Sequence, residues 1–352
     1  MPYLKDDCMP ATHRFIVLDS LRGLTALAIA LVHLPLLGGA SASQVMRDSF
    51  PLLLFFFVLS GFVLAHAHAR QLNTAAAFGH FAIGRTLRIF PLHLSLLALG
   101  LVLAIGAGEE ARHLDNPLPS LLLLQAWLPG ADSQALNPAA WPLSLGYYLW
   151  LLFGLALLAV PRGRTGVFAA IVLLAVLALH SGLNELSNSI LMGVAAFFLG
   201  ALCYRLYLAM RLIPLSPAAF TVLEFTTLGV LVLALDAGWE LAVVPLHALT
   251  LFVFAFEGGA LSGLLRLAVF RLLGRWSFSL YLSHILVFML AGGLAARMAP
   301  TALGDPWLPF AALGGALALA GVAYRCIERP GMALGRRLRT DHGVAATGQV
   351  RG

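Results

Sequence analysis

The chain has 352 residues, of which 60% are hydrophobic and only 11% are charged, and its formal net charge is +6. About a quarter of the residues in a soluble domain are charged, so this composition excludes an ordinary water-soluble protein. Apolar runs of about 20 residues recur along the whole length, as in transmembrane helices, and they lack the alternation of membrane β-barrel strands. The sequence therefore predicts an all-α membrane protein, a polytopic helical bundle.

The charge distribution predicts a membrane topology and argues against nucleic-acid binding. We expect ten spans, near residues 15–37, 50–68, 86–106, 143–160, 166–181, 189–208, 218–236, 241–257, 276–297 and 307–327. With both termini in the cytoplasm, the opposite side keeps only Arg47, Arg112 and Arg297 among the basic residues, and it holds most of the acidic ones. This separation follows the positive-inside rule. It indicates a multi-pass protein of the inner (cytoplasmic) membrane, surrounded by lipid.

The first span carries three ionisable residues, Asp19, Arg22 and His33. Such groups are costly at membrane depth and usually mark function. Asp19 can pair with Arg22 one turn later. Arg22 and His33 are eleven residues apart, which returns them to nearly the same helix face about 16 Å apart.

The same span raises the question of a cleavable signal peptide. Arg14, the apolar run and the small residues at 38–43 fit that pattern. An apolar signal core, however, has no reason to carry Asp19, Arg22 and His33. We therefore expect the span to be retained.

The third span begins with GRTLRIFPLHL at 84–94, in which Arg85 and Arg88 share one helix face. One interpretation is that both arginines extend to the membrane surface and only set the topology. The other is phosphate binding, because guanidinium groups match phosphate oxygens in pairs of hydrogen bonds. The spacing alone favours neither.

Other polar residues in apolar surroundings have simpler expected roles. Ser60 and Gly61 are small enough to allow close helix packing, and we expect Glu224 and Glu257 to form structural ion pairs. The segment at 118–130 is too short to span, which indicates a re-entrant or interfacial position in the long outer loop at 107–142. Three scattered cysteines show no metal-ligand spacing, so no metal is expected.

The last two spans carry further polar motifs. Ser277, Tyr281 and His284 recur at helical spacing and form a polar stripe, in which His284 has either a direct role or only hydrogen bonds between helices. The sequence Ile-Glu-Arg-Pro at 327–330 ends the last span, where Pro330 is expected to break the helix and the arginines that follow to anchor the chain at anionic lipid.

These motifs together resemble the acyltransferase-3 family of integral membrane O-acyltransferases. The resemblance rests on LDSLRGLTALAIALVHL at 18–34, on Arg85-x-x-Arg88, on the Ser-x-x-x-Tyr-Leu-x-His segment that ends at His284, and on the terminal I-E-x-P motif at 327–330. Trp141 and Ser144 match a Trp-Ser-Leu-Ser-x-Glu segment of the family only in part. Gly146 stands where the family has Glu.

The resemblance implies transfer of an acyl group, usually acetyl, from cytoplasmic acyl-CoA to a hydroxyl on a carbohydrate or a hydrophobic natural product. His33 is the candidate base because an imidazole can deprotonate an alcohol near neutral pH, and Asp19 and Arg22 are further catalytic candidates at the start of the same helix. Arg85 and Arg88 would bind the donor. The supporting candidates are Ser60, Trp141, Ser144, Tyr281, His284 and Glu328. We expect a tail at 1–14, a transferase domain at 15–329, a basic tail at 330–352 and no additional extracytoplasmic domain.

Several alternatives remain open from the sequence. His33 acts as a base in direct transfer or is itself acylated. A proton-coupled transporter would also carry intramembrane His33, His284 and Glu224, although we find no internal repeat. A family member that has lost its activity would explain Gly146. The acceptor, by family analogy a surface polysaccharide or lipopolysaccharide, and the oligomeric state are not determined.

Overall fold

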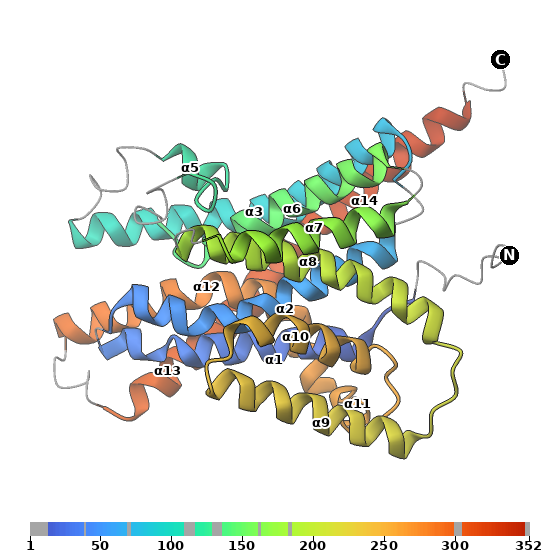
Figure 1. Ribbon diagram of the computed structural model, residues 1–352. Helices are drawn as coiled ribbons and strands as arrows, with labels where there is room; N and C mark the ends of the chain where they lie inside the picture. The colour runs from blue at the N-terminus through green and yellow to red at the C-terminus, as the bar shows by residue number, and fades with distance from the viewer. Residues whose placement is uncertain are drawn as a thin grey trace, which may run out of the picture. The chain divides into compact units, whose positions relative to one another are not determined.

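A computed structural model describes residues 13–38, 40–68, 72–108, 117–128, 136–160, 163–181, 185–298 and 305–348, and all regular structure within them is helical (Figure 1). Residues 1–12 and 349–352 of the expected tails lie outside the described residues. So do 109–116 and 129–135 of the expected outer loop.

The described helices follow one another along the chain. The first half contains α1 (Ile16–Val32), η1 (Leu34–Gly38), α2 (Ala42–His68), α3 (Ala75–Ala107), α5 (Leu118–Leu121), α6 (Ala140–Ala159) and α7 (Arg164–Leu179). The second half contains α8 (Glu185–Met210), α9 (Pro217–Asp236), α10 (Glu240–Phe254), α11 (Ala260–Leu265), α12 (Ala268–Met298), α13 (Trp307–Ala323), the π-helical turn η3 (Tyr324–Glu328) and α14 (Arg329–Gly348).

Within the described residues, 8 helical stretches are long and apolar enough to cross a membrane. They correspond to all the expected spans except 166–181 and 241–257, where α7 and α10 have 16 and 15 residues. At 1.5 Å per residue these helices are shorter than a 30 Å hydrocarbon core. Large apolar side chains are nevertheless exposed on α7 and α9, including Leu174 and Leu233, as expected of surfaces that face lipid. The protein is thus a polytopic helical membrane protein, and ten spans stay a prediction.

The chain divides into two compact units, and three helices contribute to both. Unit 1 comprises residues 1–23, 54–72 and 160–274, and unit 2 comprises 24–53, 73–159 and 275–352. The boundaries therefore fall inside α1, α2 and α12. Most of α1 and α12, including His33 and His284, belongs to unit 2.

Unit 1 is held together by helices that approach closely at glycines. A Cβ atom on Gly61 of α2 would collide with the carbonyl oxygen of Phe197, and one on Gly200 of α8 would collide with that of Val58. Small residues allow such backbone contact between membrane helices, which confirms the packing role expected for Gly61. Similarly, Gly23 of α1 lies against Gly274 of α12.

Unit 2 is built around an apolar core that α3, α6, α12 and α13 share with the segment after α5. Its buried members are Ile89, Leu92, Leu96, Leu123, Ala140, Leu143, Tyr147, Leu282, Leu286 and Ala323. The segment at 118–128 is therefore folded into unit 2, and Leu123, Gln125 and Ala126 are almost completely buried. It also contains a residue with an unusual backbone conformation: Leu123 has a φ of 58°, a left-handed value that residues other than glycine rarely adopt.

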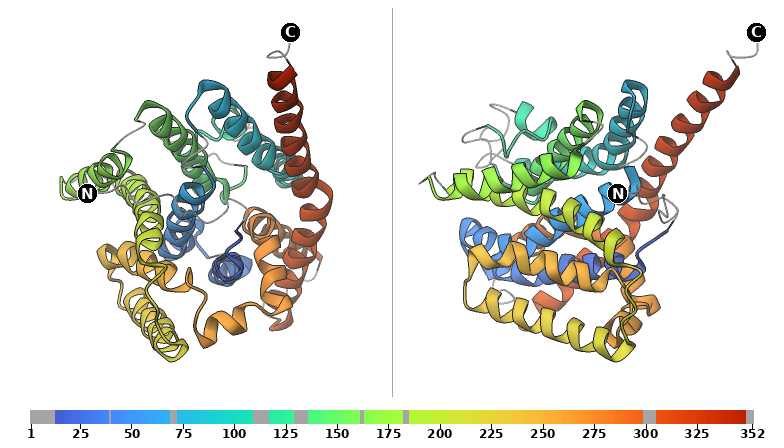
Figure 2. Two further views of the ribbon diagram at one scale, coloured as in Figure 1. Left: turned by 90° about the vertical axis from the view of Figure 1, so that its right-hand side faces the viewer. Right: turned by 45° about the vertical axis from the view of Figure 1, so that its right-hand side comes forward.

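The C-terminal helix corrects one expectation from the sequence, because Pro330 does not end it. The π-helical turn at Tyr324–Glu328 shifts the hydrogen-bond register, and α14 then begins at Arg329, so Pro330 stands in its first turn. A proline inside a helix removes one backbone hydrogen bond, and the π-helical turn directly before Pro330 is the local irregularity of this otherwise continuous helix. The expected domain boundary at 329/330 thus falls inside continuous helix, which Figure 2 shows as the long red helix near the C-terminus.

Within unit 2, α14 runs along α3. Gly331 lies against the carbonyl oxygen of Leu87, and Gly335 lies against Gly84. The backbones touch because none of the three glycines has a side chain there. The start of the arginine-rich tail is therefore packed beside the helix that carries Arg85 and Arg88.

Candidate functional site

His33 lies where α1 passes into the 3₁₀ turn η1, and it is almost completely buried, with 2% of its surface exposed. Its Nδ1–H donates to the carbonyl oxygen of Ile29, 2.7 Å away. This bond fixes the tautomer, so Nε2 carries a lone pair and can only accept. The helix thus orients the imidazole and leaves its basic nitrogen available.

His284 of α12 lies beside it in unit 2. The two ring centroids are 4.9 Å apart and the rings are nearly perpendicular, at 78°. His284 is fully buried, and its Nδ1–H donates to the carbonyl oxygen of Tyr281 at 2.7 Å, with a longer contact to that of Leu280. Its Nε2 is therefore also a lone-pair acceptor.

The two Nε2 atoms share a further property. Both are buried, and neither has a hydrogen-bond partner among the residues that the structure describes. Buried polar atoms are nearly always paired, and one without a partner requires an explanation. A pair of unsatisfied acceptors on neighbouring rings suits a ligand that brings hydrogen-bond donors.

Arg85 is held between aromatic rings of unit 2. Its guanidinium carbon lies 5.4 Å from the ring centroid of Phe81 and 5.3 Å from that of Trp150. Stacking of this kind orients a planar guanidinium while leaving its N–H groups at the edge. Sequence reasoning missed Trp150, since nothing in the α6 sequence distinguishes it from an ordinary membrane aromatic residue.

Arg88 is one turn further along α3 and partly buried. It makes no hydrogen bond or ion pair with any residue in the described part of the chain. Arg85 and Arg88 therefore form a cationic pair on α3, as the sequence predicts. Such a pair can bind an anion with two guanidinium groups.

Asp19 and Arg22 lie in unit 1 and hold the first turns of α1. The Asp19 carboxylate pairs with Arg22 at 3.1 Å, which confirms the expected contact, and with Arg14 at 2.6 Å. Arg22 also donates to the carbonyl oxygen of Gly274, 2.9 Å away. These contacts hold α1 against α12 at the point where Gly23 and Gly274 allow the two helices to approach closely.

The other supporting candidates have structural partners. The buried Glu328 carboxylate accepts a hydrogen bond from Ser279 at 2.8 Å. Tyr281 is buried beside His284, at 5.9 Å between ring centroids. Trp141 packs edge-on against Phe50, at 6.2 Å between ring centroids. Ser60 lies partly buried in α2, next to Gly61 in unit 1.

Ser144 binds the segment after α5. Its hydroxyl donates to the carbonyl oxygen of Leu123 and accepts from the N–H of Ala126. One helical turn along α6, the hydroxyls of Tyr147 and Thr86 are hydrogen-bonded at 2.8 Å. At Gly146, where the family has Glu, α6 thus carries no carboxylate, and the adjacent tyrosine connects it to α3.

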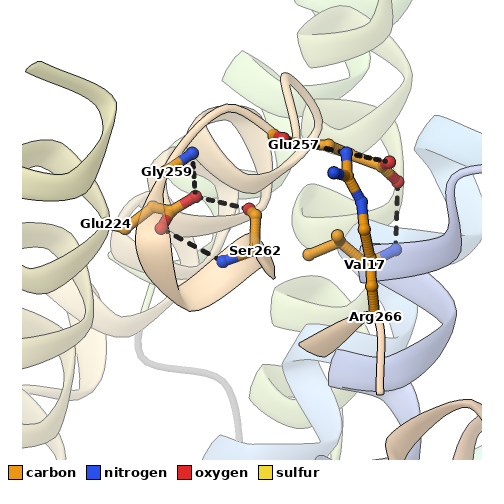
Figure 3. A network of polar contacts seen from close by, with 6 residues as sticks. All are labelled: Val17, Glu224, Glu257, Gly259, Ser262 and Arg266. Carbon is orange, nitrogen blue, oxygen red and sulfur yellow. Dashed lines mark hydrogen bonds and ion pairs between the residues drawn. The ribbon is translucent and has the colours of Figure 1, made fainter. Parts of the chain in front are cut away.

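Glu224 and Glu257 of unit 1 behave differently from each other (Figure 3). Glu257 forms an ion pair with Arg266 at 3.1 Å and accepts from the N–H of Val17, as expected of a structural pair. Glu224 corrects the expectation, because its carboxylate accepts from the N–H groups of Gly259, Leu261 and Ser262 and from the Ser262 hydroxyl. Backbone amides at the start of α11, and not a cation, satisfy this buried charge.

Gln125 is a buried polar residue that sequence reasoning missed. It is fully buried in the segment after α5, and neither atom of its amide has a partner within the described residues. Its position inside an apparent loop gave no signal. Among the described residues, no group of three or more His, Cys, Asp and Glu side chains is placed to hold a metal ion.

Comparison with known proteins agrees with the motifs. The profile of the acyltransferase-3 family, described as an acyltransferase domain, matches residues 15–325. The chain is 28% identical over 348 residues to acyltransferase MdmB of Streptomyces mycarofaciens, covering 88% of this chain and 84% of that protein. It is also 39% identical over 87 residues to protein 2 in the picA locus of Rhizobium radiobacter, covering 24% of this chain and 44% of that protein.

No solved structure gave a significant match. The family profile covers most of the chain, including α1 with His33, α3 with its arginine pair and α12 with His284. The chain therefore belongs to the acyltransferase-3 family and is a membrane acyltransferase.

Proposed function

We propose that this protein transfers an acetyl group from cytoplasmic acetyl-CoA to a hydroxyl of a cell-surface carbohydrate or another hydroxylated acceptor, with His33 as the general base. The observation that carries this proposal is the buried His33 imidazole, whose Nδ1–H is bound by Ile29 while its Nε2 lone pair has no partner among the described residues. An imidazole in this tautomer accepts a proton from an alcohol near neutral pH.

In the proposed reaction, Nε2 of His33 takes the proton of the acceptor hydroxyl as the oxygen attacks the thioester carbonyl carbon. The new C–O bond forms, the C–S bond breaks, and His33 gives the proton to the departing sulfur, which leaves as the thiol of CoA. His33 is then neutral again, and no other reactant is required.

Arg85 and Arg88 would bind the phosphates of the donor. The cation–π contacts of Arg85 with Phe81 and Trp150 support this role, because they hold a planar guanidinium whose shape matches phosphate oxygens. Asp19 and Arg22 would act as positioning residues, since their contacts hold the helix that carries His33. In the inner membrane, donor and acceptor would reach His33 from opposite sides.

The test uses purified protein in nanodiscs with radiolabelled acetyl-CoA and extracted cell-surface glycans. We expect the wild type to transfer label, and His33→Ala to lower kcat by about 10²- to 10⁴-fold, the usual contribution of a general base. Arg85→Ala and Arg88→Ala should mainly raise the KM for acetyl-CoA. His180→Ala is the matched control, because His180 is exposed at the end of α7 and binds only its own helix.

Two results would contradict the proposal. If His33→Ala transfers label as fast as the wild type, His33 is not the base. If the wild type transfers label to no acceptor, the protein lacks this activity. Label bound covalently to His33 when no acceptor is present would replace direct transfer with an acyl-enzyme route.

A further inference from the structure

We propose that His284 is an acceptor-binding residue, and that the acceptor is a diol whose two neighbouring hydroxyl groups donate separately to His33 and His284. This inference rests on the proposed function, because it assigns the reacting hydroxyl to His33. It adds the second group that holds the acceptor, and with it a requirement for the acceptor's chemistry.

Both histidines carry their ring proton on Nδ1. Each Nδ1–H donates to a carbonyl oxygen of its own helix, Ile29 for His33 and Tyr281 for His284. A neutral imidazole has one N–H, so both Nε2 atoms are acceptors. The two rings therefore cannot hydrogen-bond to each other through Nε2, although their centroids are only 4.9 Å apart.

The surroundings supply no donor for these lone pairs. Both Nε2 atoms are buried without a partner among the described residues. Besides His33, the rings of Tyr281 and Phe288 lie near His284, at 5.9 and 5.8 Å between ring centroids. A buried acceptor without a donor costs free energy that a ligand can return by donating a hydrogen bond.

The ligand that satisfies both atoms must bring two donors. A single alcohol has one O–H and would leave one Nε2 unsatisfied. Two hydroxyls on adjacent carbons can donate to both nitrogens at the usual length of about 2.8 Å. A ligand ammonium would bring an unpaired charge into this buried site, and a carboxylate or phosphate would bring negative charge to two neutral acceptors, so neighbouring hydroxyls fit best.

The two hydroxyls then have different fates. The one at His33 loses its proton to Nε2 and becomes the acylated oxygen. The one at His284 keeps its proton and donates throughout, so it fixes which of the two oxygens faces the thioester. His284 exchanges no proton in this scheme, and it sets regioselectivity and affinity.

The turn after His33 packs against the helix that carries His284. η1 follows His33 directly, and α12 contacts it near its end. A Cβ atom placed on Gly292 of α12 would lie 3.4 Å from the carbonyl oxygen of Leu37. Such contacts limit sliding between the elements that carry the two rings.

The experiment compares acceptors that differ by one hydroxyl. The probes are 1,2-cyclohexanediol and cyclohexanol, each with radiolabelled acetyl-CoA. We expect kcat/KM of the wild type to be roughly 5- to 100-fold higher for the diol, the effect of leaving one buried acceptor unpaired.

The variants separate binding from a structural role. His284→Phe keeps an aromatic side chain but removes the hydrogen-bond acceptor, so the ratio of kcat/KM for the diol to that for cyclohexanol should fall to about one through a higher KM for the diol. His284→Gln offers a carbonyl oxygen and should restore part of the preference. If His284 served only in packing, the substitution would lower kcat/KM for the diol and for cyclohexanol by the same factor. His180→Phe is the matched control.

The outcomes are distinguishable. Equal rates with diols and single alcohols in the wild type overturn this inference but leave the proposed function intact. This comparison needs no variant, so it holds even if the His284 variants do not fold. A diol preference that survives in His284→Phe also overturns it. A wild type that acylates no probe or glycan overturns the proposed function and this inference with it.

Discussion

The hydroxyl of Ser144 donates a hydrogen bond to the carbonyl oxygen of Leu123, 2.5 Å away, and the Ser144 Oγ also accepts from the N–H of Ala126 at 3.1 Å. A single side chain on α6 thus satisfies a donor and an acceptor of a buried segment. That segment has no helix of its own beyond the short α5, so its backbone depends on such partners.

This relationship predicts that Ser144→Ala destabilises the protein by about 1–3 kcal/mol, because two buried backbone groups lose their partner. Leu123 adds to the effect, since its left-handed backbone conformation is held by these contacts. Thermal unfolding in detergent measures the change. Ser95→Ala is the control, because the exposed Ser95 donates only to a carbonyl of its own helix. Equal unfolding temperatures for both variants would contradict the prediction.

The close contact between α2 and α8 predicts that Gly61→Ala and Gly200→Ala each separate the two helices. A Cβ there would overlap a backbone carbonyl oxygen, which cannot move like a side chain. We expect a loss of about 1–3 kcal/mol, as for overpacking in a core. In Gly229→Ala the new methyl meets nothing, and alanine favours a helix, so this control should keep or raise the unfolding temperature.

The backbone N–H groups that bind the Glu224 carboxylate predict that Glu224→Gln loosens the start of α11. The substitution removes the charge and replaces one acceptor oxygen with an NH₂ group that faces N–H donors. Charge-assisted hydrogen bonds contribute about 1.5–3 kcal/mol each, so the variant should lose at least that much stability. Hydrogen exchange at Gly259 and Leu261 should accelerate. Asp236→Asn, at an exposed carboxylate, should leave exchange there unchanged.

The stacked guanidinium of Arg85 predicts that charge alone is insufficient for donor binding. Arg85→Lys keeps the positive charge but loses the planar group between Phe81 and Trp150. A cation–π contact contributes about 0.5–2 kcal/mol, which corresponds to roughly a 2- to 30-fold rise in the KM for acetyl-CoA. Arg88→Lys, outside the stack, should raise KM less. Equal effects of the two substitutions would show that stacking is unimportant.

The sequence alone was sufficient for the fold class and the family. Long apolar runs specify membrane helices because backbone groups in lipid must bond within the segment, and the local pair of Asp19 and Arg22 follows from helical spacing. The motif around His33 is likewise contained within one helix. Such features depend only on neighbouring residues, so periodicity and composition report them.

Tertiary structure decided the relationships between distant residues. His284 faces His33, amides after α10 bind Glu224, and Trp150 covers Arg85, although each pair is far apart in the sequence. Pro330 continues a helix because a π-helical turn precedes it. Periodicity gives the face of a helix on which a residue lies, but packing determines what that face meets. The partners of buried polar atoms are therefore decided only when the helices pack.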